Sequence, residues 1–345
     1  MSILLAVIAF GGLVAFHEAG HMWAARRLGM RVERFSIGFG PVVLRRRRGE
    51  TEYALSAIPI GGYVKIAGMA PEDEVRPDDP RSYQNKPAWA RLLVILAGPA
   101  SNYLLAFLIG VPILMTAVPA PDLSSTRVGQ VLSHSPAARA GLESGDDIRW
   151  IGGKAVRNFD EIKTAIQSAS KDHPGKPIPF VVLRSGKSRM LGITPKDGLI
   201  GIGPATRLLP PLPFAQAIGR SFTRLGEETR DSAHVLGMLL TGKAGLHDLE
   251  GPIGIGSDIA SSAESGLASY FEMVWLVSVA LGFLNLLPIP ALDGGRGVFL
   301  LYELVSRRRV NPRLEATIHT VGLLVLVVLI LFVSKGDVAR LWHGR

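Results

Sequence analysis

Four long apolar stretches constrain the fold of this chain more than any other feature of its sequence. A helix needs roughly 20 apolar residues to cross the hydrocarbon core of a bilayer. The stretches lie at about Ile3–Ala25, Leu92–Val118, Phe271–Leu287 and Ala316–Val333, and the last two are short for a full crossing. The first could instead be a secretory signal, but it lacks a basic leader and an A-x-A cleavage site. We therefore expect a polytopic α-helical membrane protein with about four transmembrane helices.

Composition supports a membrane setting and limits the kinds of site. Of the 345 residues, 48% are hydrophobic and only 19% are charged, which is less polar than a typical soluble protein. The formal net charge of +9 comes in short basic clusters beside the apolar stretches, which favours the lipid bilayer over nucleic acid as the partner. Because there is no cysteine, disulfides and thiolate metal sites are excluded. Any transition metal must bind through His, Asp or Glu.

Basic residues also predict the orientation of the chain in the membrane. Cytoplasmic loops of membrane proteins carry an excess of Lys and Arg. Two loops here are rich in arginine, one with Arg45–Arg48 after the first stretch and one with Arg307–Arg309 before the fourth. We therefore place both loops in the cytoplasm. The N-terminus, the C-terminus and residues 120–205 are then expected outside.

The segments between the apolar stretches form separate structural regions. Within residues 31–68, apolar and β-branched runs are separated by glycine turns, which indicates short antiparallel strands at the cytoplasmic membrane face. The predicted organisation is a first transmembrane helix over 1–30, a membrane-associated β-sheet and loop over 31–90, a second transmembrane helix over 91–119, an extracytoplasmic α+β domain over 120–205, a linker with an amphipathic helix over 206–266, and two transmembrane helices over 267–345.

The sequence HEAGH, at the end of the first apolar stretch, predicts a metal site. In a helix, positions i and i+4 share a face, so His17 and His21 can offer two imidazoles to one ion while Glu18 lies beside them. The alternative is an ordinary polar patch at a helix end. Ionisable groups at depth in a bilayer cost about 2.5–3.5 kcal/mol each, so an unligated cluster would weaken the span. We therefore favour a metal, with zinc the expected ion.

A catalytic zinc usually takes three protein ligands, so a third must come from elsewhere in the chain. The candidate is Asp293 in NLLPIPALDGG, residues 285–295, where the third apolar stretch reaches its cytoplasmic end. Pro288 and Pro290 interrupt the helix there, and irregular backbone could aim the carboxylate inward. The alternative is that Asp293 only caps the following helix.

Several motifs together carry a family resemblance. FHEAGH, GGYVKIAGM, AGPASN, EGPIGI and NLLPIPALDGG occur in this order along nearly the whole chain. The chain resembles the site-2 protease family of intramembrane zinc metalloproteases, and in particular its RseP-type bacterial members. The resemblance implies Zn²⁺ held by His17, His21 and Asp293, with Glu18 as catalytic acid/base. It also implies that Asn285 and the neighbouring Pro288 help to hold the substrate, and that the chain lies in a bacterial inner membrane.

The outer segment carries a second resemblance. SPAARAGL, followed by a turn at SGDDI, a strand, and an amphipathic helix bearing Phe159, Ile162 and Ile166, is similar to a bacterial PDZ domain over about Arg127–Pro204. This likeness implies binding of an extended peptide or chain end by strand addition. The alternative is a domain that only limits access by its bulk. Many RseP-type proteins carry two tandem PDZ domains, whereas residues 205–266 show no second SPAxxAGL pattern.

Three further motifs have weaker interpretations. In IGGYVKIAG, Gly61, Gly62 and Tyr63 suit an exposed strand edge that could bind an unwound substrate, although a plain membrane-surface hairpin is an equal alternative. Asn102 in AGPASN could hydrogen-bond near the site, but helix packing is the safer interpretation. His319 is interpreted as an interfacial histidine, with a role beside the site as the alternative.

The predicted function is intramembrane zinc endopeptidase, cutting the membrane segments of single-span proteins such as anti-sigma factors or signal-peptide remnants. Two other classes remain open. A non-catalytic receptor or scaffold would bind peptides through the PDZ-like domain and keep a structural metal. A metal transporter would use the intramembrane His and Asp residues as an ion path, although the inverted repeats typical of transporters are not visible.

Overall fold

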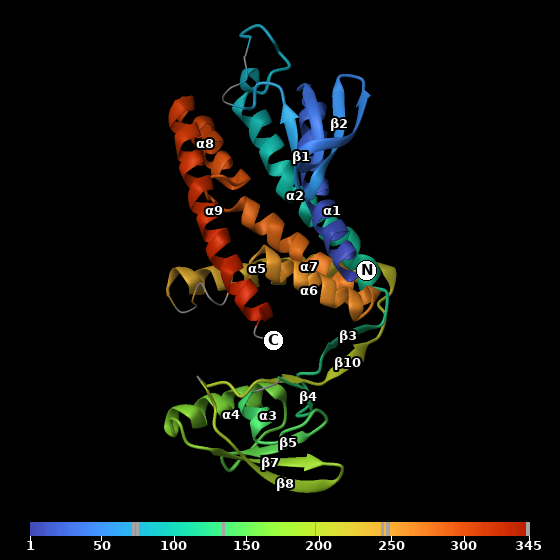
Figure 1. Ribbon diagram of the computed structural model, residues 1–345, viewed down its shortest axis with the longest axis vertical. Helices are drawn as coiled ribbons and strands as arrows, with labels where there is room; N and C mark the ends of the chain where they lie inside the picture. Colours follow the sequence, from blue (N-terminus) through green and yellow to red (C-terminus); the bar gives the residue numbers. More distant parts are fainter. Residues whose placement is uncertain are drawn as a thin grey trace. The chain divides into compact units, whose positions relative to one another are not determined.

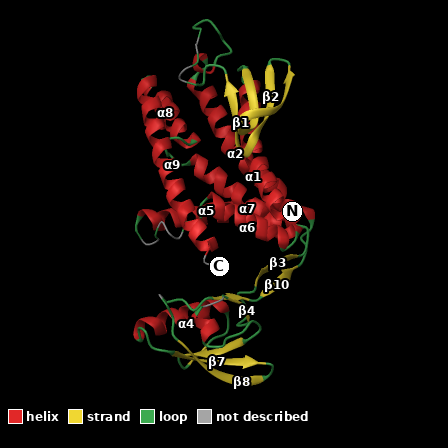
Figure 2. Cartoon of the chain, in the orientation of Figure 1, coloured by secondary structure: helices red, strands yellow, loops and turns green. Residues whose placement is uncertain are grey.

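The computed structural model of the chain describes residues 1–70, 73, 76–132, 135–196, 198–242, 245 and 249–342. It divides into two compact units (Figure 1). Unit 1 comprises residues 1–115 and 212–344, and unit 2 comprises residues 116–211. Unit 1 is mainly helical with one folded pair of strands, and unit 2 combines strands with two helices (Figure 2).

Within its described residues, unit 1 contains four helices that are long and apolar enough to cross a membrane, as the sequence predicts. They are α1 (Ser2–Arg27), α2 (Ala88–Leu114), α7 (Leu267–Leu286) and α9 (Pro312–Trp342). The second helix was expected to run to residue 119 but ends at Leu114, and Val118–Pro121 is a strand, β3. Pro119 disfavours helical backbone at the residue before it, which explains the extended conformation there. The fourth helix is longer than its apolar stretch.

The linker over 206–266 holds two helices rather than one. The predicted amphipathic helix is α5 (Phe214–Leu240), and α6 (Pro252–Glu264) follows it. The N-terminus of α6 is capped by a residue from a distant part of the chain. The buried carboxylate of Asp337 on α9 accepts hydrogen bonds from the backbone N–H groups of Gly251 and Gly254, at 3.1 and 2.9 Å. These bonds satisfy donors that every helix N-terminus leaves free.

The sheet predicted within residues 31–68 is built from two long strands, not from several short ones. Strands β1 (Val32–Arg48) and β2 (Thr51–Ile66) both fold back on themselves, so residues 34–37 pair with residues 62–65 on one side and with residues 52–55 on the other. Glycines at the bends, such as Gly38 with φ +86° and Gly61 with φ +107°, allow this path. Among the described strands, residues 62–66 pair on one side only and form a sheet edge.

Unit 2 is an α+β domain with an apolar core. Its remaining strands are β4 (Val128–Val131), β5 (Asp147–Ile151), β6 (Lys154–Ala155), β7 (Ile178–Arg184), β8 (Lys187–Ile193), β9 (Ile202–Pro204) and β10 (Thr206–Leu209). Strands β6, β5, β7 and β8 form a four-stranded sheet in that order, while β4 pairs with β9 and β3 with β10. The helices are α3 (Pro136–Arg139) and α4 (Phe159–Asp172).

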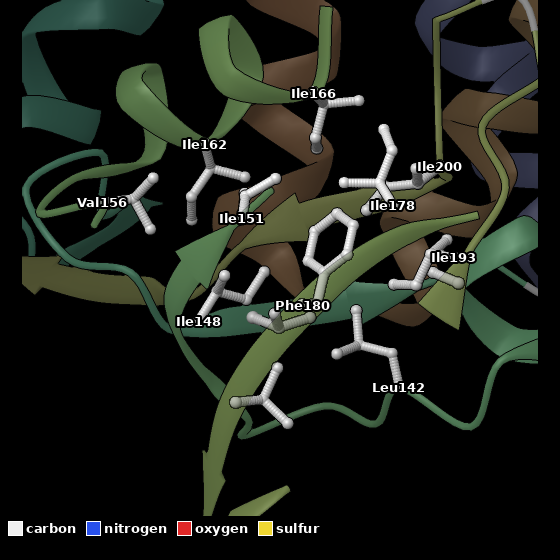
Figure 3. Close-up of a cluster of buried hydrophobic side chains, with 13 residues drawn as sticks. Leu142, Ile148, Ile151, Val156, Ile162, Ile166, Ile178, Phe180, Ile193 and Ile200 are labelled. Atoms are coloured by element: carbon white, nitrogen blue, oxygen red, sulfur yellow. The ribbon is translucent and has the colours of Figure 1, made fainter. Parts of the chain in front are cut away.

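The core of unit 2 lies between α4 and the four-stranded sheet (Figure 3). Ile162 and Ile166 of α4 are 1% and 5% exposed, as the predicted amphipathic helix requires. They belong to one cluster with Ile148 of β5 and Phe180 of β7, which are fully buried. Each such side chain contributes about 1.5–3 kcal/mol by leaving water.

Candidate metal centre

The structure brings the three predicted ligands together. Helix α1 presents His17 and His21 one turn apart, and Asp293 is the first residue of α8 (Asp293–Ser306). The Nε2 atoms of the two histidines lie 3.0 and 3.2 Å from Oδ2 of Asp293, and 3.2 Å from each other. Both histidines are more than nine-tenths buried. Among the described residues, this is the group of His, Asp and Glu whose donor atoms converge closely enough for one ion.

A tightly packed turn between α7 and α8 carries Asp293 to this place. Gly294 has no room for a side chain, because a Cβ there would overlap the carbonyl oxygen of Leu287. Two residues before Asp293, Ala291 has φ +78°, and its N–H donates a 3.0 Å hydrogen bond to Nδ1 of His319 on α9. His319, interpreted from the sequence as interfacial, therefore contacts the segment that carries the carboxylate.

Helix α2 closes the other side of the two imidazoles. Gly98 must be glycine here, because a Cβ would overlap the ring of His21 and lie 2.9 Å from that of His17. The carbonyl oxygen of Val94 lies 2.8 Å from Nδ1 of His21, and Nδ2 of Asn102 lies 3.0 Å from Nδ1 of His17. AGPASN was interpreted mainly as a packing motif, with a hydrogen bond of Asn102 near the site as the alternative, and the structure has that hydrogen bond. In the sequence, this contact is indicated by Asn102, a polar residue in an apolar span one helical turn after Gly98.

Glu18 lies on the same helix but has a different partner. Its Oε2 accepts a 3.0 Å hydrogen bond from the backbone N–H of Val64 in β2. That N–H belongs to the sheet edge formed by residues 62–66. The contact therefore joins the predicted acid/base to the edge of the sheet.

The predicted substrate-binding residues are placed in two groups. Gly61 and Gly62 pack closely on Phe39 and on the carbonyl oxygen of Ser36, at positions where a Cβ would clash. The Tyr63 ring stacks on Phe39 with 6.4 Å between ring centroids. All three residues directly precede Val64, so their backbone runs beside Glu18.

Asn285 and Pro288 lie at the end of α7 and in the turn that follows it. The Asn285 amide donates a 3.0 Å hydrogen bond to the carbonyl oxygen of Leu281 in its own helix, and Pro288 is exposed. Within the described residues, no hydrogen bond or ion pair joins either of them to the three ligands.

The residues present fit a zinc ion. Oδ2 of Asp293 is buried, and two imidazole nitrogens lie within 3.2 Å of it. Two imidazole nitrogens and one carboxylate oxygen are a donor set that zinc accepts, and three protein ligands leave a position for water. A cation between these atoms would satisfy the buried oxygen and both rings together.

Comparison with known proteins identifies the family. The sequence model described as peptidase family M50 matches residues 5–329. The chain belongs to peptidase family M50. The resemblance to site-2 proteases is thereby confirmed, and with it the assignment as a membrane metalloprotease. Together with its four apolar helices, membership makes this M50 peptidase a multi-pass protein of the inner membrane.

Curated relatives match this M50 peptidase over almost their whole length. It is 32% identical to Metalloprotease MmpA of Caulobacter vibrioides, over 95% of this chain and 93% of the relative. It is 29% identical to Zinc metalloprotease RasP of Geobacillus kaustophilus, over 98% of each. It is also 29% identical to Regulator of sigma E protease of Salmonella typhi, over 97% of this chain and 98% of the relative.

Proposed function

We propose that this M50 peptidase is a zinc endopeptidase that cuts the membrane-spanning segments of single-span membrane proteins in regulated intramembrane proteolysis. The observation that carries the proposal is the convergence of His17, His21 and Asp293 on one point, with Glu18 on the same helix turn. Because one relative is called a regulator of sigma E protease, anti-sigma factors are a substrate class to test first, with signal-peptide remnants as the second.

The chain's own residues divide the chemistry between them. Zinc held by the two histidines and Asp293 would polarise the scissile carbonyl and lower the pKa of a water from 15.7 to about 7. Glu18 takes the proton of the attacking water and returns it to the leaving amine. The N–H of Val64 holds Oε2 of Glu18, which leaves Oε1 to accept the proton. Gly98 lets α2 cover the imidazoles closely, which limits the entry of bulk water.

The sheet edge provides a way to hold the substrate. Peptide bonds in a transmembrane helix are closed by internal hydrogen bonds, so the substrate must unwind before a carbonyl can reach the metal. Residues 62–66 have a strand partner on one side only, and Glu18 accepts the Val64 N–H on the other, so an extended substrate can add along this edge as a further strand next to Glu18. Gly61, Gly62 and Tyr63 form the approach to this edge. Asn285 and Pro288, at the end of α7, are the proposed contacts on the opposite side of the substrate.

The proposed orientation puts the metal centre near the cytoplasmic face, with unit 2 and both termini outside. It is supported by the arginines of the β1–β2 hairpin, Arg45–Arg48, which are exposed. Because the chain has no cysteine, single introduced thiols can test it. In whole cells, a membrane-impermeant maleimide should label Ser125→Cys in unit 2 and spare Arg47→Cys. The opposite pattern would reverse the topology.

Unit 2 is proposed to be a single PDZ-like domain that binds an extended peptide or a chain end. Its SPAARAGL segment forms α3, with Oγ of Ser135 accepting the N–H of Ala138 at 3.1 Å, and its strands and α4 follow in the order that the resemblance implies. Alignment with the Salmonella relative spans 445 positions although this chain has 345 residues, so the relative carries extra sequence of a small domain's size. This difference supports one such domain here.

Cleavage of a single-span model substrate by the purified full chain in detergent tests the proposal. Glu18→Gln should abolish cleavage while zinc stays bound, because the carboxylate moves protons and is not a ligand. A chelator should also abolish it, and added zinc should restore it. Glu264→Gln, an exposed carboxylate on α6, is the matched control and should cleave normally. Cleavage by Glu18→Gln at the rate of the unmodified chain would overturn the mechanism.

A further inference from the structure

Asn102 is a buried polar residue that takes no part in the proposed chemistry described above. It lies on α2, is fully buried, and places Nδ2 3.0 Å from Nδ1 of His17. Its backbone carbonyl accepts a 2.9 Å hydrogen bond from the hydroxyl of Ser278 on α7, not from His17. Its side-chain oxygen, Oδ1, is buried and has no hydrogen-bond partner among the described residues. A buried oxygen without a donor costs free energy in the state that leaves it so, and such an oxygen needs an explanation.

The two histidine ligands differ in what faces their second nitrogen. A neutral imidazole has one N–H donor and one lone pair. The neighbour of His21 Nδ1 is the carbonyl oxygen of Val94, 2.8 Å away, which can only accept. In the neutral ring, the proton of His21 is therefore fixed on Nδ1, and Nε2 carries the lone pair that can bind a metal.

His17 faces the side-chain amide of Asn102, which can present either a hydrogen-bond donor, Nδ2, or an acceptor, Oδ1. With Nδ2 of Asn102 donating to Nδ1 of His17, the ring proton must be on Nε2, where Oδ2 of Asp293 lies 3.0 Å away and can accept it. This arrangement pairs the ring proton of His17 without a metal, while the lone pair of His21 Nε2 still lies 3.2 Å from the same carboxylate oxygen. Ligation through Nε2 moves the ring proton to Nδ1, and there it would point at the NH₂ group of Asn102. Two donors would then face each other in a buried site.

We propose that Asn102 is a positioning residue whose side-chain amide turns over when the metal binds, so that Oδ1 accepts the Nδ1–H of His17. The turn exchanges the positions of Oδ1 and Nδ2 and requires no movement of α2. It gives the unpartnered oxygen a donor and fixes the imidazole in the ligating tautomer. The inference rests on the proposed role of His17 as a zinc ligand. Helix α2 then supplies the outer partner of both histidines, one fixed and one able to rotate.

Zinc affinity of the full chain in detergent, measured by competition with a chromophoric chelator, tests this role without measuring cleavage. Loss of such an outer partner typically weakens metal binding 10–100-fold. Asn102→Leu keeps the size and removes the acceptor, so its affinity for zinc should fall by that factor. Asn102→Asp keeps both the shape and the acceptor and should bind within a few-fold of the unmodified chain. Ser278→Ala removes the neighbouring buried hydrogen bond and should leave affinity unchanged.

The outcomes separate this inference from the proposed function. Equal zinc affinity for Asn102→Leu and the unmodified chain overturns the inference, and so does an equal loss for Asn102→Leu and Asn102→Asp. If His17→Ala binds zinc as tightly as the unmodified chain, the proposed metal site itself is wrong. Zinc binding that His17→Ala abolishes and Asn102→Leu retains would leave the proposed function intact.

Nitrogen NMR of the unmodified chain with labelled histidine gives a second test that needs no variant at Asn102. His17 should carry its proton on Nε2 in metal-free protein and on Nδ1 in zinc-loaded protein. His21 should carry it on Nδ1 in both. A His17 that is already protonated on Nδ1 without metal would overturn the proposed turn of the amide.

Discussion

The metal centre of unit 1 and the core of unit 2 are both buried, but they bury opposite kinds of groups. Around Phe180, unit 2 buries aliphatic and aromatic side chains, and each adds to the stability of that domain. Around His17, unit 1 buries imidazoles, a carboxylate and an amide inside apolar helices. Burial of such groups opposes folding unless they are paired. Changes at the metal centre should therefore act mainly on chemistry, and changes in the unit 2 core mainly on local stability.

The largest expected effect is that of Gly98→Ala, which should act on the metal centre alone and not on unit 2. Gly98→Ala puts a methyl group where the His21 ring lies, so we expect loss of both zinc binding and cleavage. The unit 2 core should be unaffected. Zinc content and cleavage of the full chain measure the first effect, and hydrogen exchange of β5 and β7 measures the second. Gly12→Ala on α1, where no atom lies within 4 Å of the added carbon, is the control. Normal zinc content in Gly98→Ala would break the comparison.

The converse experiment is Phe180→Ala in unit 2. It leaves a cavity and should lower the local free energy of unfolding by about 3–5 kcal/mol. Faster hydrogen exchange of β5 and β7 in the full chain measures this loss. Zinc affinity should stay unchanged. Leu199→Ala, at an exposed position of the same unit, should have little effect on either quantity. A loss of zinc on Phe180→Ala would show that the two regions do not act separately.

A smaller effect is expected where α9 holds the segment before Asp293. His319→Leu removes the acceptor of the Ala291 N–H, and an unpaired buried donor costs about 1–3 kcal/mol. Zinc affinity should fall by about tenfold, because the carboxylate is less firmly placed. Thr320→Ala, an exposed neighbour on the same helix, is the control. Equal zinc affinities of His319→Leu and Thr320→Ala would show that His319 does not help to position Asp293.

The smallest expected effect concerns Asp146, a buried carboxylate in unit 2, and it tests whether a buried charge in that unit acts on stability. Burial alone would raise the pKa of Asp146, but Arg184, bonded to its two oxygens at 2.7 and 2.6 Å, holds that pKa below its ordinary value. The stabilisation is complete above the pKa of an unfolded aspartate, about 3.9, and is lost as pH falls through the lower pKa of the folded state. Arg184→Met should therefore destabilise unit 2 at pH 6 and much less near pH 3. Hydrogen exchange of β5 measures both; a difference independent of pH would contradict this assignment.

Local patterns in the sequence predicted the parts of the molecule that depend on neighbouring residues. The helical spacing of His17 and His21, the amphipathic face of α4 and the four apolar helices all follow from periodicity within one element. Asp293 required topology and the family resemblance as well, because it is distant in sequence from both histidines.

What the sequence left open or did not reveal depends on contacts between distant elements. Asn102 meets His17 across 85 positions, and Asp337 caps α6 across 86 positions from Gly251. Neither contact leaves a periodic signal in its own helix. The double pairing of β1 is of the same kind, because alternation along a strand does not show how many partners the strand has.

X-ray absorption at the zinc edge of the full-length Glu18→Gln protein tests the central claim most directly. Zinc should be bound by two imidazole nitrogens at about 2.0–2.1 Å and otherwise by oxygen, as His17, His21 and Asp293 require. A zinc with three or four imidazole ligands, or a protein that retains no zinc, would contradict the claim.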